Sequence, residues 1–206
     1  MQAPNIALIL VDLQVDFMPT GMLPVAEADR VIPLANELMR EYRTVVATQD
    51  WHPGNHESFA ANHPWRKPGQ VIDLHGLEQV LWPIHCVQDT WGAEFVAELE
   101  TDRITKVFQK GTNPEVDSYS GFYDNGHRSS TGMGEWLKAQ GITEVHVVGV
   151  ATDYCVKFTV LDAISEGFAT TLITEAVRGV NLNAGDVDRA IEEMRLAGAV
   201  IRESLK

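Results

Sequence analysis

Basic residues are scarce in this chain. Its 206 residues include 16 lysines and arginines against 29 aspartates and glutamates, which gives a formal net charge of −13. The basic residues form no cluster along a predicted helix or loop. Binding to nucleic acid or to an anionic membrane surface depends on such cationic patches. We therefore expect neither nucleic acid nor a membrane as a partner.

Cysteine is equally rare, since only Cys86 and Cys155 are present. They form neither a CxxC pair nor a repeated framework, which argues against a disulfide scaffold. Both are expected to be reduced thiols.

Long hydrophobic runs are absent. No apolar run approaches the roughly 20 residues of a membrane span, and the first residues lack the basic and apolar pattern of a signal peptide. We therefore expect a soluble, cytoplasmic protein.

The chain also has no linker, internal repeat or low-complexity segment, so residues 1–206 are expected to form one domain. The sequence carries no signature of oligomeric state and leaves a monomer or a homodimer open.

The residues that are present alternate short apolar runs with segments of helical periodicity. Strands are expected at residues 6–11, 44–48, 104–108, 145–148, 170–173 and 200–201, and helices at 31–42, 93–99, around 136–137, 156–167 and 187–194. This alternation predicts an α/β fold of three layers, doubly wound, with a mostly parallel six-stranded sheet and helices on both faces.

One long segment interrupts the alternation. The region at about 50–90 shows no clear periodicity and is rich in proline, glycine, histidine and asparagine. Long irregular segments in compact domains are usually functional or disordered. The histidines and aromatics of this region favour a loop that binds metal and substrate.

Four chemically active side chains lie at the carboxyl ends of predicted strands: Asp12, Asp50, Lys110 and Cys155. In doubly wound sheets, ligands bind beyond these ends, where the strand order changes direction. The four residues are therefore expected to converge on one site.

Cys155 lies where a buried strand turns sharply into a helix. If Thr152 is the N-cap, Cys155 sits near the third helical position, where free backbone N–H groups and the helix dipole favour a thiolate. These features make Cys155 a candidate nucleophile, although an isolated buried cysteine more often only packs.

Asp12 and Lys110 supply the two aids that a cysteine nucleophile needs. Taken alone, Asp12 could be a strand-end cap and Lys110 a surface charge. Beside a thiol, the carboxylate can take the proton and the ammonium can stabilise the resulting anion. No histidine occupies a comparable strand end, which makes a cysteine–histidine pair less attractive.

A second constellation resembles a metal site. Asp50, His52 and His56 follow a DxHxxxH pattern, and His85 lies farther along the same irregular region. Such a set suits one divalent ion, with zinc the first choice and iron or manganese as alternatives. Cys86 is an alternative to His85, while any single histidine is more commonly an ordinary surface or hydrogen-bonded residue.

Aromatic residues are expected around the same cleft. Phe17, Trp82 and Tyr119 fall in loops at the carboxyl ends of the strands. They either fill core or form walls for a flat ring.

These segments together resemble a known family. The motifs DLQVDF at 12–17, DWH at 50–52, WPIHC at 82–86, KG at 110–111 and GVATDYCV at 149–156 are similar to the signatures of the nicotinamidases, which belong to the isochorismatase-like cysteine hydrolases. The match runs in order from Ile6 to about Asn181.

The resemblance implies a role for each matched residue. It implies Cys155 as nucleophile, Asp12 as proton acceptor and donor, Lys110 as the cation beside them, and Asp50, His52 and His85 as metal ligands, with His56 a fourth ligand or a neighbour. It also implies that Val150 and Ala151 contact the substrate, that a cis peptide bond precedes Ala151, and that the N–H groups of Ala151 and Cys155 face the oxyanion.

The activity implied by the resemblance is hydrolysis of nicotinamide to nicotinate and ammonia, a step in the recycling of NAD precursors. Pyrazinamide is expected to be a second substrate. Two alternatives stay open: a related hydrolase that acts on isochorismate, a carbamoyl amide or another heteroaromatic amide, and a catalytically silent sensor that binds nicotinamide or a divalent ion.

Overall fold

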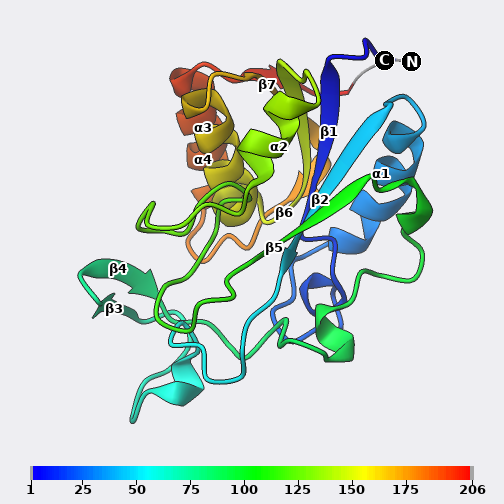
Figure 1. The fold of residues 1–206 in the computed structure, drawn as a ribbon. Coiled ribbons are helices and arrows are strands. Elements are labelled where there is room, and N and C mark those ends of the chain that lie inside the picture. The colour runs from blue at the N-terminus through cyan, green and yellow to red at the C-terminus, as the bar shows by residue number, and fades with distance from the viewer. Residues whose placement is uncertain (1, 205–206) are drawn as a thin grey trace.

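The computed structural model describes residues 2–204, which form a three-layer α/β structure (Figure 1). The central sheet contains β1 (Ile6–Val11), β2 (Thr44–Asp50), β5 (Lys106–Lys110), β6 (Glu144–Val150), β7 (Ala169–Arg178) and β8 (Val200–Arg202). Their order is β5-β2-β1-β6-β7-β8, and every pair is parallel. The predicted fold class is therefore confirmed.

Helices cover both faces of the sheet because the residues of the central strands are apolar on both sides. The helices are α1 (Val31–Met39), α2 (Met133–Ala139), α3 (Lys157–Ser165) and α4 (Asp186–Ala197). Leu8 and Leu10 of β1 pack in the core layer that contains α1, whereas Ala7 and Ile9 pack in the layer that contains α2, α3 and α4. This alternation follows from the two-residue period of a strand.

The strand order changes direction between β1 and β6, and Gly149 allows these strands to approach closely there. Gly149 has a φ of +122°, and a Cβ atom built on it would lie 2.2 Å from the carbonyl oxygen of Val11. Only glycine fits this position. The close approach brings the segment after β6 next to Asp12, which directly follows β1.

The region at 50–90 contains a feature that periodicity did not predict. Strands β3 (Val71–Leu74) and β4 (Leu77–Val80) form a separate antiparallel hairpin. The hairpin projects beyond the carboxyl edge of the sheet (Figure 1). Short turns of 3₁₀ helix connect other elements, at Val15–Phe17, Ala28–Arg30, Ala60–Asn62, Trp91–Ala93 and Thr101–Arg103.

The helix predicted at 93–99 is wrong. After the turn at Trp91–Ala93, the chain is extended and pairs with the loop after β1: the Val15 N–H donates to the carbonyl of Glu94, and the Val96 N–H donates to the carbonyl of Leu13. Backbone groups used in this pairing are not free to form helical hydrogen bonds.

Within residues 2–204, no helix has the length and apolar character needed to cross a bilayer.

Candidate active site

Asp12, Lys110 and Cys155 meet at the carboxyl edge of the sheet. The Nζ atom of Lys110 lies 2.9 Å from Oδ2 of Asp12 and 3.5 Å from Sγ of Cys155. All three side chains are buried. Lys110 ends β5, Asp12 directly follows β1 and Cys155 lies in the turn after β6. The strand order brings these three strand ends together, with β2 between β5 and β1.

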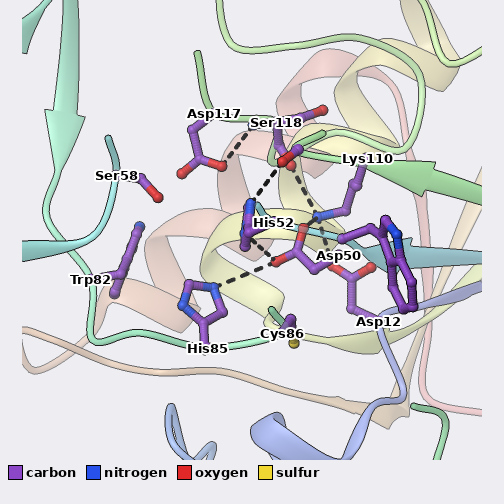
Figure 2. A network of polar contacts seen from close by, with 12 residues as sticks. Asp12, Asp50, His52, Ser58, Trp82, His85, Cys86, Lys110, Asp117 and Ser118 are labelled. Atoms are coloured by element: carbon purple, nitrogen blue, oxygen red, sulfur yellow. Dashed lines mark hydrogen bonds and ion pairs between the residues drawn. The ribbon is translucent and has the colours of Figure 1, made fainter. Parts of the chain in front are cut away.

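Lys110 is held by further oxygen atoms. Its Nζ donates to Oδ1 of Asp50 at 2.5 Å and to the carbonyl of Ser118 at 3.0 Å (Figure 2). Burial by itself lowers the pKa of Lys110, but the carboxylates of Asp12 and Asp50 outweigh it and hold the pKa well above its ordinary value. Lys110 is therefore a fixed cation at the centre of the site.

Asp12 sits at the end of β1 with a left-handed backbone, at a φ of +51°. Its Oδ1 accepts a hydrogen bond of 2.6 Å from the hydroxyl of Thr48 on the neighbouring strand. Burial is the main cause that raises the pKa of Asp12, and Lys110 and Thr48 oppose it only in part. A carboxylate with a raised pKa is well suited to accept and return a proton.

Cys155 lies in a π turn, Thr152–Val156, which leads into α3. The N-cap is Ala151, and the hydroxyl of Thr152 is buried without a hydrogen-bond partner, so the predicted Thr152 cap is wrong. Burial raises the pKa of the Cys155 thiol well above its ordinary value, although Lys110 acts in the opposite direction. The expected thiolate is therefore not the favoured resting form, because desolvation outweighs the turn and the nearby cation.

The peptide bond between Val150 and Ala151 is cis, as the resemblance implied. Ala151 borders the cavity next to Cys155. Val150, in contrast, is completely buried in the hydrophobic core and is not among the residues that line the cavity.

Asp50, His52 and His85 form a second cluster that adjoins the first. Oδ2 of Asp50 lies 3.3 Å from Nε2 of His52 and 3.6 Å from Nε2 of His85 (Figure 2). The Nδ1 atoms of the two rings lie 2.9 Å from the carbonyl of Gly111 and 2.8 Å from the carbonyl of Pro83, respectively. These carbonyls orient the rings so that both Nε2 atoms face the carboxylate.

This cluster fits a divalent ion. One carboxylate oxygen and two imidazole nitrogens within 4.8 Å of one another are donors that zinc, iron and manganese accept. Burial acts to raise the pKa of Asp50, but Lys110 and His52 outweigh it and leave the pKa well below its usual range. The carboxylate is therefore ionised and ready to bind a cation.

His56 adjoins the cluster, with its ring centroid 4.4 Å from that of His52. Its Nδ1 pairs with the hydroxyl of Ser58 at 2.7 Å, and its Nε2 is buried without a partner. Burial lowers the pKa of His56 to about 4, which keeps the ring neutral. His52, His56 and Asp117 form a further group of possible ligands. Cys86, the alternative to His85, belongs to none of the ligand groups found among residues 2–204.

A narrow cavity opens beside both clusters. Phe17, Trp82 and Tyr119 line it as expected, together with Asp50, His85, Ala151 and Cys155. Sequence reasoning missed four other lining residues, which are Leu23, Asp117, Tyr154 and Val180. Tyr154 had a local signal, because it directly precedes Cys155 in the GVATDYCV motif, whereas Leu23, Asp117 and Val180 lie far apart in the chain outside the quoted motifs.

Trp82, Tyr119 and Tyr154 form an aromatic wall along the cavity, and contacts among these residues hold it in place. The indole N–H of Trp82 donates to the hydroxyl of Tyr119 at 3.1 Å. The ring of Tyr154 meets the Trp82 ring edge-on, with centroids 4.8 Å apart. Gln79 of β4 also donates to Tyr119 and to Asp117, at 3.1 and 3.0 Å. The hairpin thereby supports the wall.

Sequence analysis also missed Gln14, whose side chain supports the backbone of Asp50. Its side-chain amide accepts from the N–H of Asp50 and donates to the carbonyl of Asp50, both at 2.8 Å. The pair of bonds fixes the backbone of Asp50. The available signal was its place in the DLQVDF motif, two residues after Asp12.

The Isochorismatase domain model matches residues 6–204. The chain belongs to the isochorismatase family. Among other members, the nicotinamidase of Escherichia coli strain K12 is 48% identical over 205 residues, which cover 96% of this chain and 94% of that protein.

Solved structures of family members are also similar. The nicotinamidase/pyrazinamidase of Acinetobacter baumannii superposes with a TM-score of 0.95 at 46% identity, covering 98% of this chain and 97% of that one. The pyrazinamidase of Pyrococcus horikoshii, solved in complex with zinc, gives a TM-score of 0.79 at 40% identity, covering 98% of this chain and 100% of that one.

Proposed function

We propose that this protein is a nicotinamidase that hydrolyses nicotinamide to nicotinate and ammonia and also accepts pyrazinamide. The observation that carries the proposal is the position of Lys110 between Asp12 and Cys155, next to the cluster of Asp50, His52 and His85. The likeness to nicotinamidases over nearly the whole chain supports the same activity.

The reaction begins with transfer of the thiol proton of Cys155 to Asp12. The thiol has a raised pKa, so it needs a base at the moment of attack, and a carboxylate oxygen of Asp12 lies within 4.8 Å of Sγ. The ammonium of Lys110, 3.5 Å from Sγ, stabilises the thiolate as it forms. The sulfur then attacks the amide carbon.

The resulting tetrahedral oxyanion is bound by backbone N–H groups. We assign this role to the N–H groups of Ala151 and Cys155, because Ala151 borders the cavity beside the sulfur. Backbone donors fixed in a buried site stabilise such an anion without reorganisation.

Asp12 returns its proton to the leaving nitrogen as the carbon–nitrogen bond breaks, because an unprotonated amide anion is a poor leaving group. Ammonia departs and a thioester on Cys155 remains. Asp12 then accepts a proton from water, which attacks the thioester and releases the carboxylic acid as the thiol is restored.

Asp50, His52 and His85 would hold one divalent metal ion, with His56 as a further ligand or neighbour. Zinc is our first assignment because the similar pyrazinamidase from Pyrococcus horikoshii was solved with zinc, while iron and manganese suit the same donors. When bound, the ion would hold the ring nitrogen of the substrate and so direct the carboxamide toward Cys155.

The aromatic wall selects a flat ring. Trp82, Tyr119 and Tyr154 contact one another around the cavity, and Phe17 packs edge-on against His85 with ring centroids 5.6 Å apart. We also propose a cytoplasmic location, since Cys86 and Cys155 are both free thiols, as is usual in a reducing compartment.

The decisive experiment measures ammonia release from nicotinamide by purified protein before and after chelation, with metal analysis in parallel. We expect turnover that falls when metal is removed and returns when zinc, iron or manganese is added. Binding of nicotinamide without ammonia release by the metal-loaded protein would instead identify a silent sensor. Turnover of another amide but not of nicotinamide would identify a related hydrolase.

A further inference from the structure

Trp65 is exposed to solvent in the loop between the 3₁₀ turn Ala60–Asn62 and β3. Its side chain is 99% exposed, and its backbone has a φ of +65°. The loop projects from the lower left of the molecule, away from the sheet (Figure 1). An exposed indole forgoes the gain from burial, and a bulky residue in the left-handed region is strained. Strained backbone positions cluster at functional sites, so this one suggests a function.

The neighbours of Trp65 are basic. Arg66 and Lys67 are exposed, and the segment 61–70 contains no acidic residue in a chain with a net charge of −13. Neither side chain takes part in an ion pair found among residues 2–204. We call Trp65, Arg66 and Lys67 the aromatic tip.

A groove with a volume of about 720 Å³ lies elsewhere, against α1. Its apolar floor includes the buried residues Met18 and Ile32, and Trp91 borders it with 71% of its side chain exposed. No residue of the active-site clusters lines it. We call this surface the α1 groove.

The charges around the α1 groove are acidic. Asp29 and Glu98 line it, both are exposed, and no basic residue does so. Neither carboxylate takes part in an ion pair found in the described part of the chain. The groove therefore offers an apolar floor with an acidic rim.

We propose that the α1 groove of one copy of this chain binds the aromatic tip of a second copy. Trp65 would fill the apolar floor beside Trp91, and Arg66 and Lys67 would pair with Asp29 and Glu98. Each surface supplies what the other lacks: an unburied indole meets an unfilled apolar groove, and unpaired cations meet unpaired carboxylates. If each copy inserts its aromatic tip into the α1 groove of the other, the same contact forms twice, as in a symmetric dimer. The inference is independent of the proposed activity.

The first test measures association by sedimentation velocity across micromolar concentrations. We expect the wild-type protein to self-associate and Trp65→Ala to raise the dissociation constant by at least about tenfold, since a central tryptophan commonly dominates an interface. Leu196→Ala is the matched control, because Leu196 is 72% exposed on α4, outside both surfaces. A wild-type protein that stays monomeric, or a Trp65→Ala protein that associates normally, would overturn the proposal.

The second test identifies the two surfaces as each other's partners. One variant reverses the charge of the aromatic tip, with Arg66→Glu and Lys67→Glu. The other reverses the charge of the groove rim, with Asp29→Lys and Glu98→Lys. Each variant alone is expected to lose association, because like charges face each other, while an equimolar mixture regains it. Unchanged melting temperatures show that both variants fold. Failure of the mixture to associate would refute the pairing of tip and groove.

Discussion

Asp50 and Lys110 are direct partners in the register of β2 and β5, and their side chains meet at 2.5 Å between Oδ1 and Nζ. The other oxygen of the same carboxylate, Oδ2, faces Nε2 of His52 and of His85. One carboxylate therefore belongs to both clusters, the one around Cys155 and the one that fits a metal. Because of this sharing, a change at Lys110 or Asp50 should affect both clusters.

Lys110→Met should abolish activity and also destabilise the protein. It leaves the carboxylates of Asp12 and Asp50 buried without their cation, for which a loss of about 3–5 kcal/mol in the free energy of unfolding is expected. Chemical denaturation measures this loss. The matched control is Lys138→Met, which removes an exposed ion pair with Glu166 and should cost under about 1 kcal/mol. Equal losses would contradict the central position of Lys110.

The two cysteines should differ sharply in function. Cys155→Ala is expected to lower the turnover of nicotinamide by at least about a thousandfold, because it removes the attacking sulfur. Cys86 is equally buried, but its Sγ has only a weak contact, 3.9 Å from the carbonyl of Gly92. Cys86→Ala should therefore keep most of the activity. A comparable loss in both variants, measured as ammonia release, would remove the basis for calling Cys155 the nucleophile.

Thr48→Val should move the acidic limb of the pH profile to higher pH. The Thr48 hydroxyl stabilises the ionised form of Asp12, so its loss raises the Asp12 pKa further. The proposed mechanism needs ionised Asp12 as the base, so activity is expected to fall as pH drops through that pKa. The measurement is kcat/KM against pH, and Thr170→Val, at a buried threonine that bonds the Phe168 carbonyl, is the control. If the acidic limb of the Thr48→Val profile does not move, a group other than Asp12 controls it.

Gly111→Ala should weaken metal binding. A Cβ atom on Gly111 would lie 2.4 Å from Cε1 of His52, so the ring must move away from the position that the Gly111 carbonyl fixes. We expect the affinity for zinc, measured by competition with a chelator, to fall by about tenfold or more. Gly167→Ala tests whether backbone strain alone is responsible, since Gly167 also has a positive φ but open space around it. An unchanged affinity in Gly111→Ala would show that the His52 ring does not need this position.

The sheet could be predicted because its signals are local. Short apolar runs and four-residue helical steps depend only on neighbours in the sequence, and all six strands were found, with β5 shifted toward Lys110. The errors arose where distant segments decide the structure. Residues 94–96 are extended because they pair with the loop after β1, and the β3–β4 hairpin supports an aromatic wall formed by Trp82 and Tyr119.

The sequence by itself determined that Asp12, Asp50, Lys110 and Cys155 follow or end four strands, since chain order and residue type decide that. Only the tertiary structure decided the protonation of these groups, raising the pKa of Cys155 and Asp12 and lowering that of Asp50. It also decided that Val150 faces the core while Tyr154 faces the cavity. The physical reason is that desolvation and Coulomb energies depend on burial and on distances between charges, which contacts between distant segments create.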